Sequence, residues 1–510
     1  MIFNSIEYLI FLPIVFLIYW AISYSRINDS LKLRLQNAFV VIASYVFYGW
    51  WDWRFLLLIA FTSFCSWGSG LLIAKNASKD AEDLKGGQNL SFASNIHALN
   101  ITHHTSQKFW LWLNIAINLG ILGIFKYYDF FVTEFGNIFG ISTSSLLLRV
   151  ILPVGISFYT FQALSYSIDV YRGNIKPTKD IIAFFAFISF FPQLVAGPIE
   201  RAANLLPQFL RNRKFSYDQG VDGMRQILWG LFKKIVIADN CATYVDQVWS
   251  TYGTQSGSTL LLAAVLFTFQ IYGDFSGYSD IAIGTAKLFG IKLMRNFNNP
   301  YFSRDIAEFW RRWHISLTTW FRDYVYIPLG GSRVGKWKII RNTFIIFLVS
   351  GIWHGANWTF LAWGAYHAVL FLPLILLGKN RKYTGQVAVG RWLPTWKEAL
   401  QMLLTFGMVV IGWVIFRAET IGLAWEYICG MMHIETLRAI YLFFTLHGVR
   451  TTCWLCALML IVEWVMRNKQ HGLEISKLHP VVRWITIIAV IGGILCFLPS
   501  TPSQFIYFQF

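Results

Sequence analysis

Two histidines in this chain lie in aromatic, apolar surroundings where a titratable side chain is costly. His354 stands in LVSGIWHGANWTF (348–360), a stretch typical of a membrane span, and His314 stands in RRWHIS. Counted from Arg341 at about 1.5 Å per residue, His354 lies roughly 20 Å along its helix. Burying an ionisable group costs several kcal/mol unless it is paired or solvated, so an intramembrane histidine indicates a functional site.

A histidine in such a place suits general base catalysis, because its ordinary pKa is close to the pH at which proteins operate. The alternative for His354 is a core histidine whose ring nitrogens bond to backbone carbonyls or to a neighbour. For His314 the surrounding arginines and tryptophans also suit a structural place in an interfacial helix. His367 is predicted to be structural, and His103 and His104, without metal-ligand spacing to other donors, are predicted to be surface residues.

Other polar residues near these histidines are predicted to have mainly structural roles. Asp274 and Asp280 in YGDFSGYSD follow an apolar run, and we expect them to form buried ion pairs with an arginine of the amphipathic segment described next. Asn357, which follows His354, is grouped with them as a polar structural residue. Gly351 and Gly355 flank His354 and would let another helix, or a substrate chain, approach closely.

The segment 287–341 is basic and amphipathic, with eleven Lys or Arg residues against three acids. On a helix over 309–331, aromatic and aliphatic side chains share one side and arginines fall off it, which predicts an interfacial or re-entrant helix on the cytoplasmic side. Its arginines would hold the phosphates of a coenzyme or phosphopantetheine arm; the alternative is simple positive-inside bias. The candidates are Arg304, Arg311, Arg312 and Arg322.

The composition predicts an all-α polytopic membrane protein. Of 510 residues, 56% are hydrophobic and 14% charged, and the mean hydropathy is +0.49. Apolar runs are long and continuous, unlike the short alternating segments of a β-barrel. The net charge of +17 lies mostly in short loops, which indicates positive-inside bias and anionic lipid rather than nucleic acid. Cys453 and Cys456 are predicted to be packed helix residues, without a metal or redox role.

The apolar runs predict one membrane-embedded unit over 1–510. The N-terminal run is predicted to be a retained anchor with the N-terminus outside the cell membrane, and the polar insertion 76–107 to be a mobile cytoplasmic loop. Two basic stretches flank 180–197, so we expect FFPQLVAGPIE (190–200) to break that helix and to border an internal cavity. The candidate spans are 8–24, 37–51, 55–74, 109–126, 146–168, 180–197, 222–238, 258–273, 343–353, 357–378, 399–416, 451–466 and 481–498.

Several motifs together resemble those of the membrane-bound O-acyltransferases. They are FFPQLVAGPIER, QIYGDFSGYSDIAIG, NFNNPYFSRDIAEFWRRWHISLTTWFRDYVYIPLGG, SGIWHGANWTFLAWGAYH, GWVIFRAE and the terminal FIYFQF. The chain is most similar to the bacterial branch that O-acetylates alginate and peptidoglycan, and the resemblance covers essentially its whole length. The combination of W-H-I-S and W-H-G-A is highly specific. The departures are Ile199 and Glu200 after the Gly-Pro break, and the insertion 76–107.

The resemblance implies a twisted ring of transmembrane and re-entrant helices around a central funnel. It implies that His354 is catalytic and His314 a second essential or supporting residue, with no bound cofactor and acetyl-CoA or an acyl-carrier thioester as cosubstrate. Neutral His354 would deprotonate the acceptor hydroxyl, and His314 would orient it or polarise the thioester carbonyl. The acceptor would be an exported polysaccharide, and an SGNH-hydrolase-like acetyltransferase outside the inner membrane would be the partner.

Two alternatives stay open at this point. Within the enzyme class, the chain would O-acetylate peptidoglycan, or transfer D-alanine to teichoic acid with a carrier protein as donor. From another class, it would be a transporter for lipid-linked glycans, since broken helices and a central cavity suit that function equally well.

Overall fold

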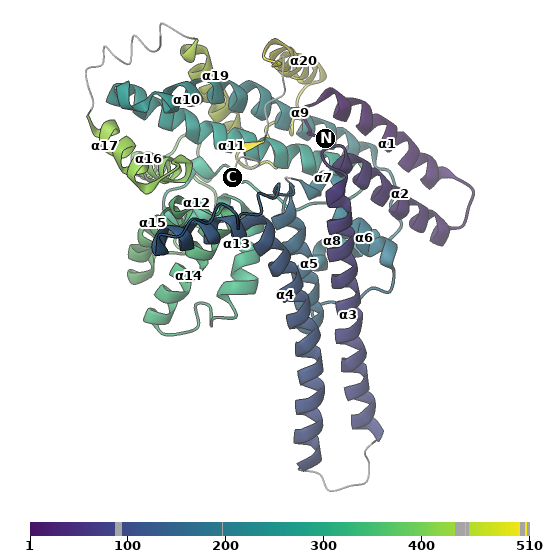
Figure 1. The fold of residues 1–510 in the computed structure, drawn as a ribbon. Helices are drawn as coiled ribbons and strands as arrows, with labels where there is room; N and C mark the ends of the chain where they lie inside the picture. The colour runs from purple at the N-terminus through teal and green to yellow at the C-terminus, as the bar shows by residue number, and fades with distance from the viewer. Residues whose placement is uncertain (87–93, 196, 434–443, 445–447, 500–504, 507–510) are drawn as a thin grey trace. The chain divides into compact units, whose positions relative to one another are not determined.

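The structure is a computed structural model that describes residues 1–510 except 87–93, 196, 434–443, 445–447, 500–504 and 507–510. Among the described residues all regular structure is helical (Figure 1). Six helices are long and apolar enough to cross a membrane, namely those containing 6–24, 55–75, 106–139, 257–288, 358–376 and 396–417. The prediction of an all-α multi-pass membrane protein is therefore confirmed.

The described chain forms two compact units. Unit 1 consists of Met1, Ile6–Tyr217 and Ala286–Leu293, and unit 2 consists of Ile2–Ser5, Asp218–Thr285 and Met294–Phe510. Both candidate histidines lie in unit 2.

Unit 1 is built around long apolar helices. The antiparallel α3 and α4 lie side by side (Figure 1), and a buried polar seam joins them to α5, where Asn114 donates to Ser167 Oγ at 2.8 Å and Ser66 Oγ donates to Asn114 at 3.1 Å. The helices are α1 (Ile6–Tyr24), α2 (Asp29–Gly49), α3 (Arg54–Gly86), α4 (Ser94–Phe139), α5 (Ile156–Tyr171), α6 (Ile181–Ser189), α7 (Phe191–Leu194) and α8 (Ala202–Phe209).

Two predictions for unit 1 are wrong in part. The insertion 76–107 is not a loop over most of its length, because α3 extends to Gly86 and α4 begins at Ser94. Residues 87–93 and the side chains of His103 and His104 lie outside the described residues. The span expected at 146–168 starts too early, because the left-handed Gly155 (φ 73°) precedes the first turn of α5.

The predicted break near 190–200 is confirmed. Helix α6 ends at Ser189, Phe190 has non-helical backbone angles, and the short α7 follows with a proline in its first turn. The backbone N–H of Phe191 donates to Ser44 Oγ at 3.0 Å. A side chain from α2 thus satisfies a backbone group at the break, as membrane-embedded irregular backbone requires.

Unit 2 contains α9 (Tyr217–Leu231), the π-helix η1 (Phe232–Ala238), α10 (Asp239–Ser250), α11 (Gly257–Leu288), α12 (Ile306–Arg312), α13 (Ile315–Phe321), the π-helix η4 (Arg322–Tyr326), α14 (Lys336–His354), α15 (Trp358–Leu376), α16 (Trp396–Arg417), α17 (Ile421–Met432), α19 (Val449–Val465) and α20 (Pro480–Cys496). The span predicted at 222–238 is α9 continued by η1, while α12 and α13 are short helices within the predicted amphipathic segment.

Helix α11 forms the core of unit 2. Its most apolar window is 83% buried, against 22% for α1, whose side chains are largely exposed. Glycines bring α11 against α9: a Cβ on Gly277 would lie 2.8 Å from the carbonyl oxygen of Gly230, and one on Gly284 would lie 2.5 Å from that of Gly223. Backbones that meet so closely pack well without a hydrophobic driving force, as helices in lipid must.

Candidate active site

His354 is the last residue of α14, at the turn that connects α14 to α15. The chain leaves the helix at Gly355, in extended conformation, and Asn357 caps α15. The Asn357 side chain accepts from the N–H of Thr359 at 3.0 Å and donates to the carbonyl of Glu419 at 2.9 Å. Asn357 therefore fixes the turn immediately after His354 and its place beside the end of α16.

Glycines bring α14 and α15 into backbone contact behind His354. A Cβ on Gly351 would lie 2.3 Å from the carbonyl oxygen of Phe360, and one on Gly364 would lie 2.4 Å from that of Phe347. The expectation that Gly351 lets another helix approach is confirmed, and the helix is α15. The space beside Gly355 is filled by the Phe360 ring.

Aromatic rings surround the imidazole of His354, which is only 5% exposed. The ring centroids of Trp353, Trp363 and Phe416 lie 4.9, 5.0 and 5.2 Å from that of His354, all in edge-to-face geometry. Three helices, α14, α15 and α16, therefore hold the ring in one orientation.

His314 lies at the junction of α12 and α13, in a backbone conformation that L-residues rarely adopt. Its φ and ψ are 42° and 54°, in the left-handed region, and its side chain is 1% exposed. Such strain persists where surrounding contacts determine it, and it occurs often at functional sites. Here Ile315 N donates to Asn296 O at 2.8 Å and Asn298 N donates to Arg312 O at 2.9 Å. Burial lowers the pKa of His314 to about 3, so the ring is neutral at physiological pH.

Trp353 contacts both histidines and so brings the two predicted residues to one place. Its ring centroid lies 4.9 Å from His354 and 6.0 Å from His314. His367, predicted to be structural, belongs to the same aromatic cluster, with its ring 5.0 Å from Trp310 and 5.1 Å from Trp363.

Arg304 and Arg312 both bind one buried glutamate, Glu308. Its carboxylate accepts from Arg304 Nη2 at 2.9 Å and from Arg312 Nη2 at 2.8 Å, and Glu308 is 1% exposed. Arg304 also reaches Glu398 at 3.4 Å. These charge-assisted bonds fix α12, which leads directly to His314.

The other two candidate arginines differ in exposure. Arg311 donates to the backbone carbonyls of Asn380 and Tyr383 at 2.8 and 2.7 Å, so it ties α12 to the segment after α15. The Arg322 side chain is 55% exposed and pairs with Asp323 at 2.6 Å. Of the four arginines proposed to bind phosphate, Arg322 is the one with its side chain mostly in contact with solvent.

Asp274 and Asp280 form buried ion pairs, but the expected arginine partner is wrong. Lys234 Nζ lies 2.8 Å from Asp274 Oδ1, and Lys233 Nζ lies 2.6 Å from Asp280 Oδ2. Both lysines belong to η1. The wider turn of a π-helix lets two consecutive lysines face α11. Sequence reasoning missed them, although two lysines inside the apolar run FKKIVIA were a visible signal.

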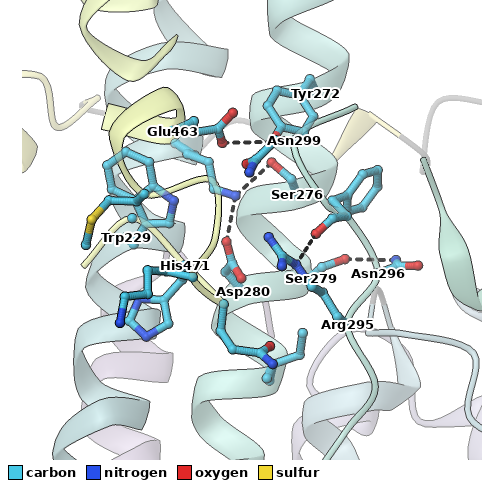
Figure 2. Close-up of a pocket in the computed structure, with 17 residues that line it drawn as sticks. Trp229, Tyr272, Ser276, Ser279, Asp280, Arg295, Asn296, Asn299, Glu463 and His471 are labelled. Carbon is cyan, nitrogen blue, oxygen red and sulfur yellow. Dashed lines mark hydrogen bonds and ion pairs between the residues drawn. The ribbon is translucent and has the colours of Figure 1, made fainter. Parts of the chain in front are cut away.

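A small polar pocket, with a volume of about 20 Å³, lies beside α11. Figure 2 shows Asp280, Glu463, Arg295 and Asn296 around it, with Asn296 joined to Ser279 of α11. Glu463 accepts from Tyr272 Oη at 2.7 Å. Sequence reasoning singled out neither Glu463 nor Asn296. No group of three or more His, Cys, Asp or Glu residues with metal-binding geometry occurs within the described ranges.

The chain is similar in sequence to several known proteins. Residues 175–415, which include both histidines, match the profile of the MBOAT, membrane-bound O-acyltransferase family. The chain is 40% identical over 406 residues to the probable alginate O-acetylase AlgI of Pseudomonas aeruginosa, covering 79% of this chain and 71% of that protein. It is 32% identical to the peptidoglycan O-acetyltransferase of Helicobacter pylori, covering 98% and 95%. It is 31% identical to the teichoic acid D-alanyltransferase of Bacillus subtilis, covering 52% and 69%.

Proposed function

The chain belongs to the membrane-bound O-acyltransferase family, and we propose that it transfers acetyl groups from a cytoplasmic thioester toward an exported, alginate-like polysaccharide. Membership makes it a multi-pass membrane acyltransferase that uses an acyl donor and a polymer acceptor. Acetyl-CoA as donor, the bacterial inner membrane as location and an outward N-terminus complete the proposal.

One observation carries the proposed site: two buried histidines from separate segments both contact Trp353. Acyl transfer to a hydroxyl needs a base for the hydroxyl proton and groups that hold the reactants in line. We assign the base to His354. Its fixed orientation at a helix end suits proton transfer, and His314 holds a substrate group beside it.

The reaction balances without a further reagent. The acceptor oxygen attacks the thioester carbonyl carbon, the new C–O bond forms, and His354 takes the hydroxyl proton. The C–S bond then breaks, and His354 gives the proton to the departing thiolate, which leaves as a thiol. The enzyme returns to its starting state, so each cycle consumes one acyl thioester.

Two polymer classes are candidates for the acceptor. Similarity to the alginate O-acetylase at 40% identity favours an alginate-like polysaccharide, and the nearly complete coverage of the peptidoglycan O-acetyltransferase makes peptidoglycan the second candidate. An SGNH-hydrolase-like partner outside the membrane would take the acetyl group onward. The similarity to the teichoic acid D-alanyltransferase spans only 52% of this chain, so D-alanyl transfer is less favoured.

The test supplies acetyl-CoA with a labelled acetyl group to the purified protein in lipid, with alginate or peptidoglycan fragments as acceptors. We expect wild-type protein to consume the thioester and to label the acceptor. His354→Ala should lose at least about 100-fold in rate, the usual contribution of a general base. His479→Ala is the control, since His479 is exposed at the start of α20 and does not line the pocket in Figure 2.

The outcome separates the enzyme from the transporter alternative. Full thioester consumption by His354→Ala contradicts the assignment of the base. A wild-type protein that consumes no thioester, yet moves lipid-linked glycan between the two faces of a vesicle, contradicts the enzyme proposal itself.

A further inference from the structure

The hydrogen bonds around Asn296 determine which nitrogen of His314 carries a proton. Asn296 is 1% exposed, and its Oδ1 accepts from the backbone N–H of Ser316 at 3.3 Å and from Ser316 Oγ at 2.8 Å. Its Nδ2 donates to Ser279 Oγ on α11 at 3.1 Å. A backbone N–H can only donate, so the atom that it meets must be the amide oxygen, and the amide orientation is fixed.

The same amide oxygen lies 3.1 Å from His314 Nδ1. An oxygen that only accepts requires a donor opposite it, so Nδ1 carries the hydrogen. In a neutral imidazole the other nitrogen, Nε2, then presents a lone pair. Within the described residues this buried Nε2 has no hydrogen-bond partner, so a group from outside those residues is needed to satisfy it.

We infer that Asn296 is a positioning residue that holds His314 as the Nδ1–H tautomer, so that Nε2 accepts a hydrogen bond from an O–H or N–H group of a substrate. This inference rests on the proposed function and decides between the two roles expected for His314. A lone pair repels a carbonyl oxygen, so His314 does not polarise the thioester carbonyl. It orients a hydroxyl of the acceptor, or an amide N–H of a pantetheine arm.

The environment of the ring supports a fixed neutral state. Phe275 of α11 lies edge-on with its centroid 4.6 Å from that of His314, Phe297 stacks at 6.3 Å, and Trp353 of α14 lies at 6.0 Å. Several charged groups on these elements and on α12 have their own partners: Asp274 and Asp280 pair with Lys234 and Lys233, Arg312 pairs with Glu308, and Arg295 donates to the carbonyl of Phe297. His354 follows Trp353 on α14.

The experiment compares Asn296→Asp, Asn296→Ala and wild type across pH 5.5 to 8.5 by labelled acetyl transfer. A carboxylate at position 296 still accepts from Nδ1–H, but it also stabilises the imidazolium, whose Nε2 is protonated. If the carboxylate raises the pKa of His314 by about three units, Asn296→Asp should transfer acetyl groups at about the wild-type rate at pH 8.5 and about fourfold more slowly than wild type at pH 5.5. Asn296→Ala frees the tautomer and should lose about tenfold at every pH.

Two comparisons separate positioning from mere structural damage. Asn298→Asp adds the same charge two residues away. Among the described residues the partners of His314 Nδ1 are Asn296 and Ser316, so the pH profile of Asn298→Asp should follow that of wild type. An Asn296→Asp profile parallel to that of wild type overturns the inference.

A second measurement covers variants that do not fold. In protein with ¹⁵N-labelled histidine, the signals missing from His314→Gln identify the ring, and their shifts report which nitrogen is protonated. A proton on Nε2 in the wild type overturns the inference. Wild-type protein that transfers no acetyl group counts against the proposed function alone, because the nitrogen shifts still test the tautomer.

Discussion

Replacing Glu308 with glutamine should destabilise the protein by an amount that its contacts allow us to estimate. The Glu308 carboxylate accepts from Nε and Nη2 of Arg304 at 3.0 and 2.9 Å and from Nε and Nη2 of Arg312 at 3.1 and 2.8 Å. Glutamine has the same shape, but it removes the charge and turns one acceptor into a donor that faces guanidinium N–H groups. Removing one partner of a buried ion pair typically costs about 3–5 kcal/mol.

The lower end of that range applies here because Glu398, 3.4 Å from Arg304, still neutralises part of the charge of Arg304 in the variant. We therefore expect a loss of about 3 kcal/mol, or roughly 6 °C in Tm at about 2 °C per kcal/mol for a large domain. Activity should fall as well, because α12 leads into the strained backbone of His314.

The assay is thermal unfolding of purified protein in lipid–detergent micelles, at one scan rate because such proteins unfold irreversibly. Glu426→Gln is the matched control: Glu426 accepts from Tyr252 Oη at 3.0 Å in an exposed contact, so its Tm should change by no more than about 1 °C. A Glu308→Gln protein with the Tm of that control would refute the view that the two arginines serve mainly to fix α12.

Three further predictions follow from the packing and the charges. Gly351→Ala should lower both Tm and transfer rate, since its Cβ would lie 2.3 Å from the carbonyl oxygen of Phe360, whereas Gly407→Ala, with nothing within 4 Å, should be close to neutral. Lys234→Met leaves two buried carboxylates without their cation and should cost about 3 kcal/mol in thermal unfolding; an unchanged Tm would contradict this. The pKa of His314 is 6.5 in the unfolded chain and about 3 in the folded protein. Below pH 6.5 the unfolded chain therefore binds a proton that the folded protein does not, and the free energy of unfolding is about 2 kcal/mol lower at pH 5 than above pH 6.5. The Tm of His314→Gln should consequently drop less between pH 7 and pH 5 than that of wild type, and equal drops would argue against a buried neutral ring.

Long apolar runs predicted the apolar helices well, because such a run has few alternatives in lipid. The spans expected at 8–24 and 399–416 match α1 and α16 within a few residues. The proline-rich break after α6 was also visible, since a proline and a glycine interrupt an apolar run.

The rest depended on tertiary structure. The two lysines of FKKIVIA are visible in the sequence, but their pairing with Asp274 and Asp280 is not, because a π-helical turn changes which residues face α11. The contact between His354 and His314 through Trp353 likewise requires the fold, since the two segments are separate in sequence. The role of Asn296 rests on the orientation of one amide group, which no sequence pattern encodes.

The paired charges on η1 and α11 constrain how this chain enters the lipid bilayer. A lysine at the centre of a lone helix costs about 2.5–3.5 kcal/mol to insert, and η1 carries two of them, 3% and 1% exposed once folded. Their aspartates on α11 are synthesised later, so when α9 and η1 meet the translocon only Lys234 has a counter-ion nearby in sequence, Asp239 at the start of α10. These segments would wait at the interface until α11 arrives and then enter with it, which makes this pair of helices the unit of insertion.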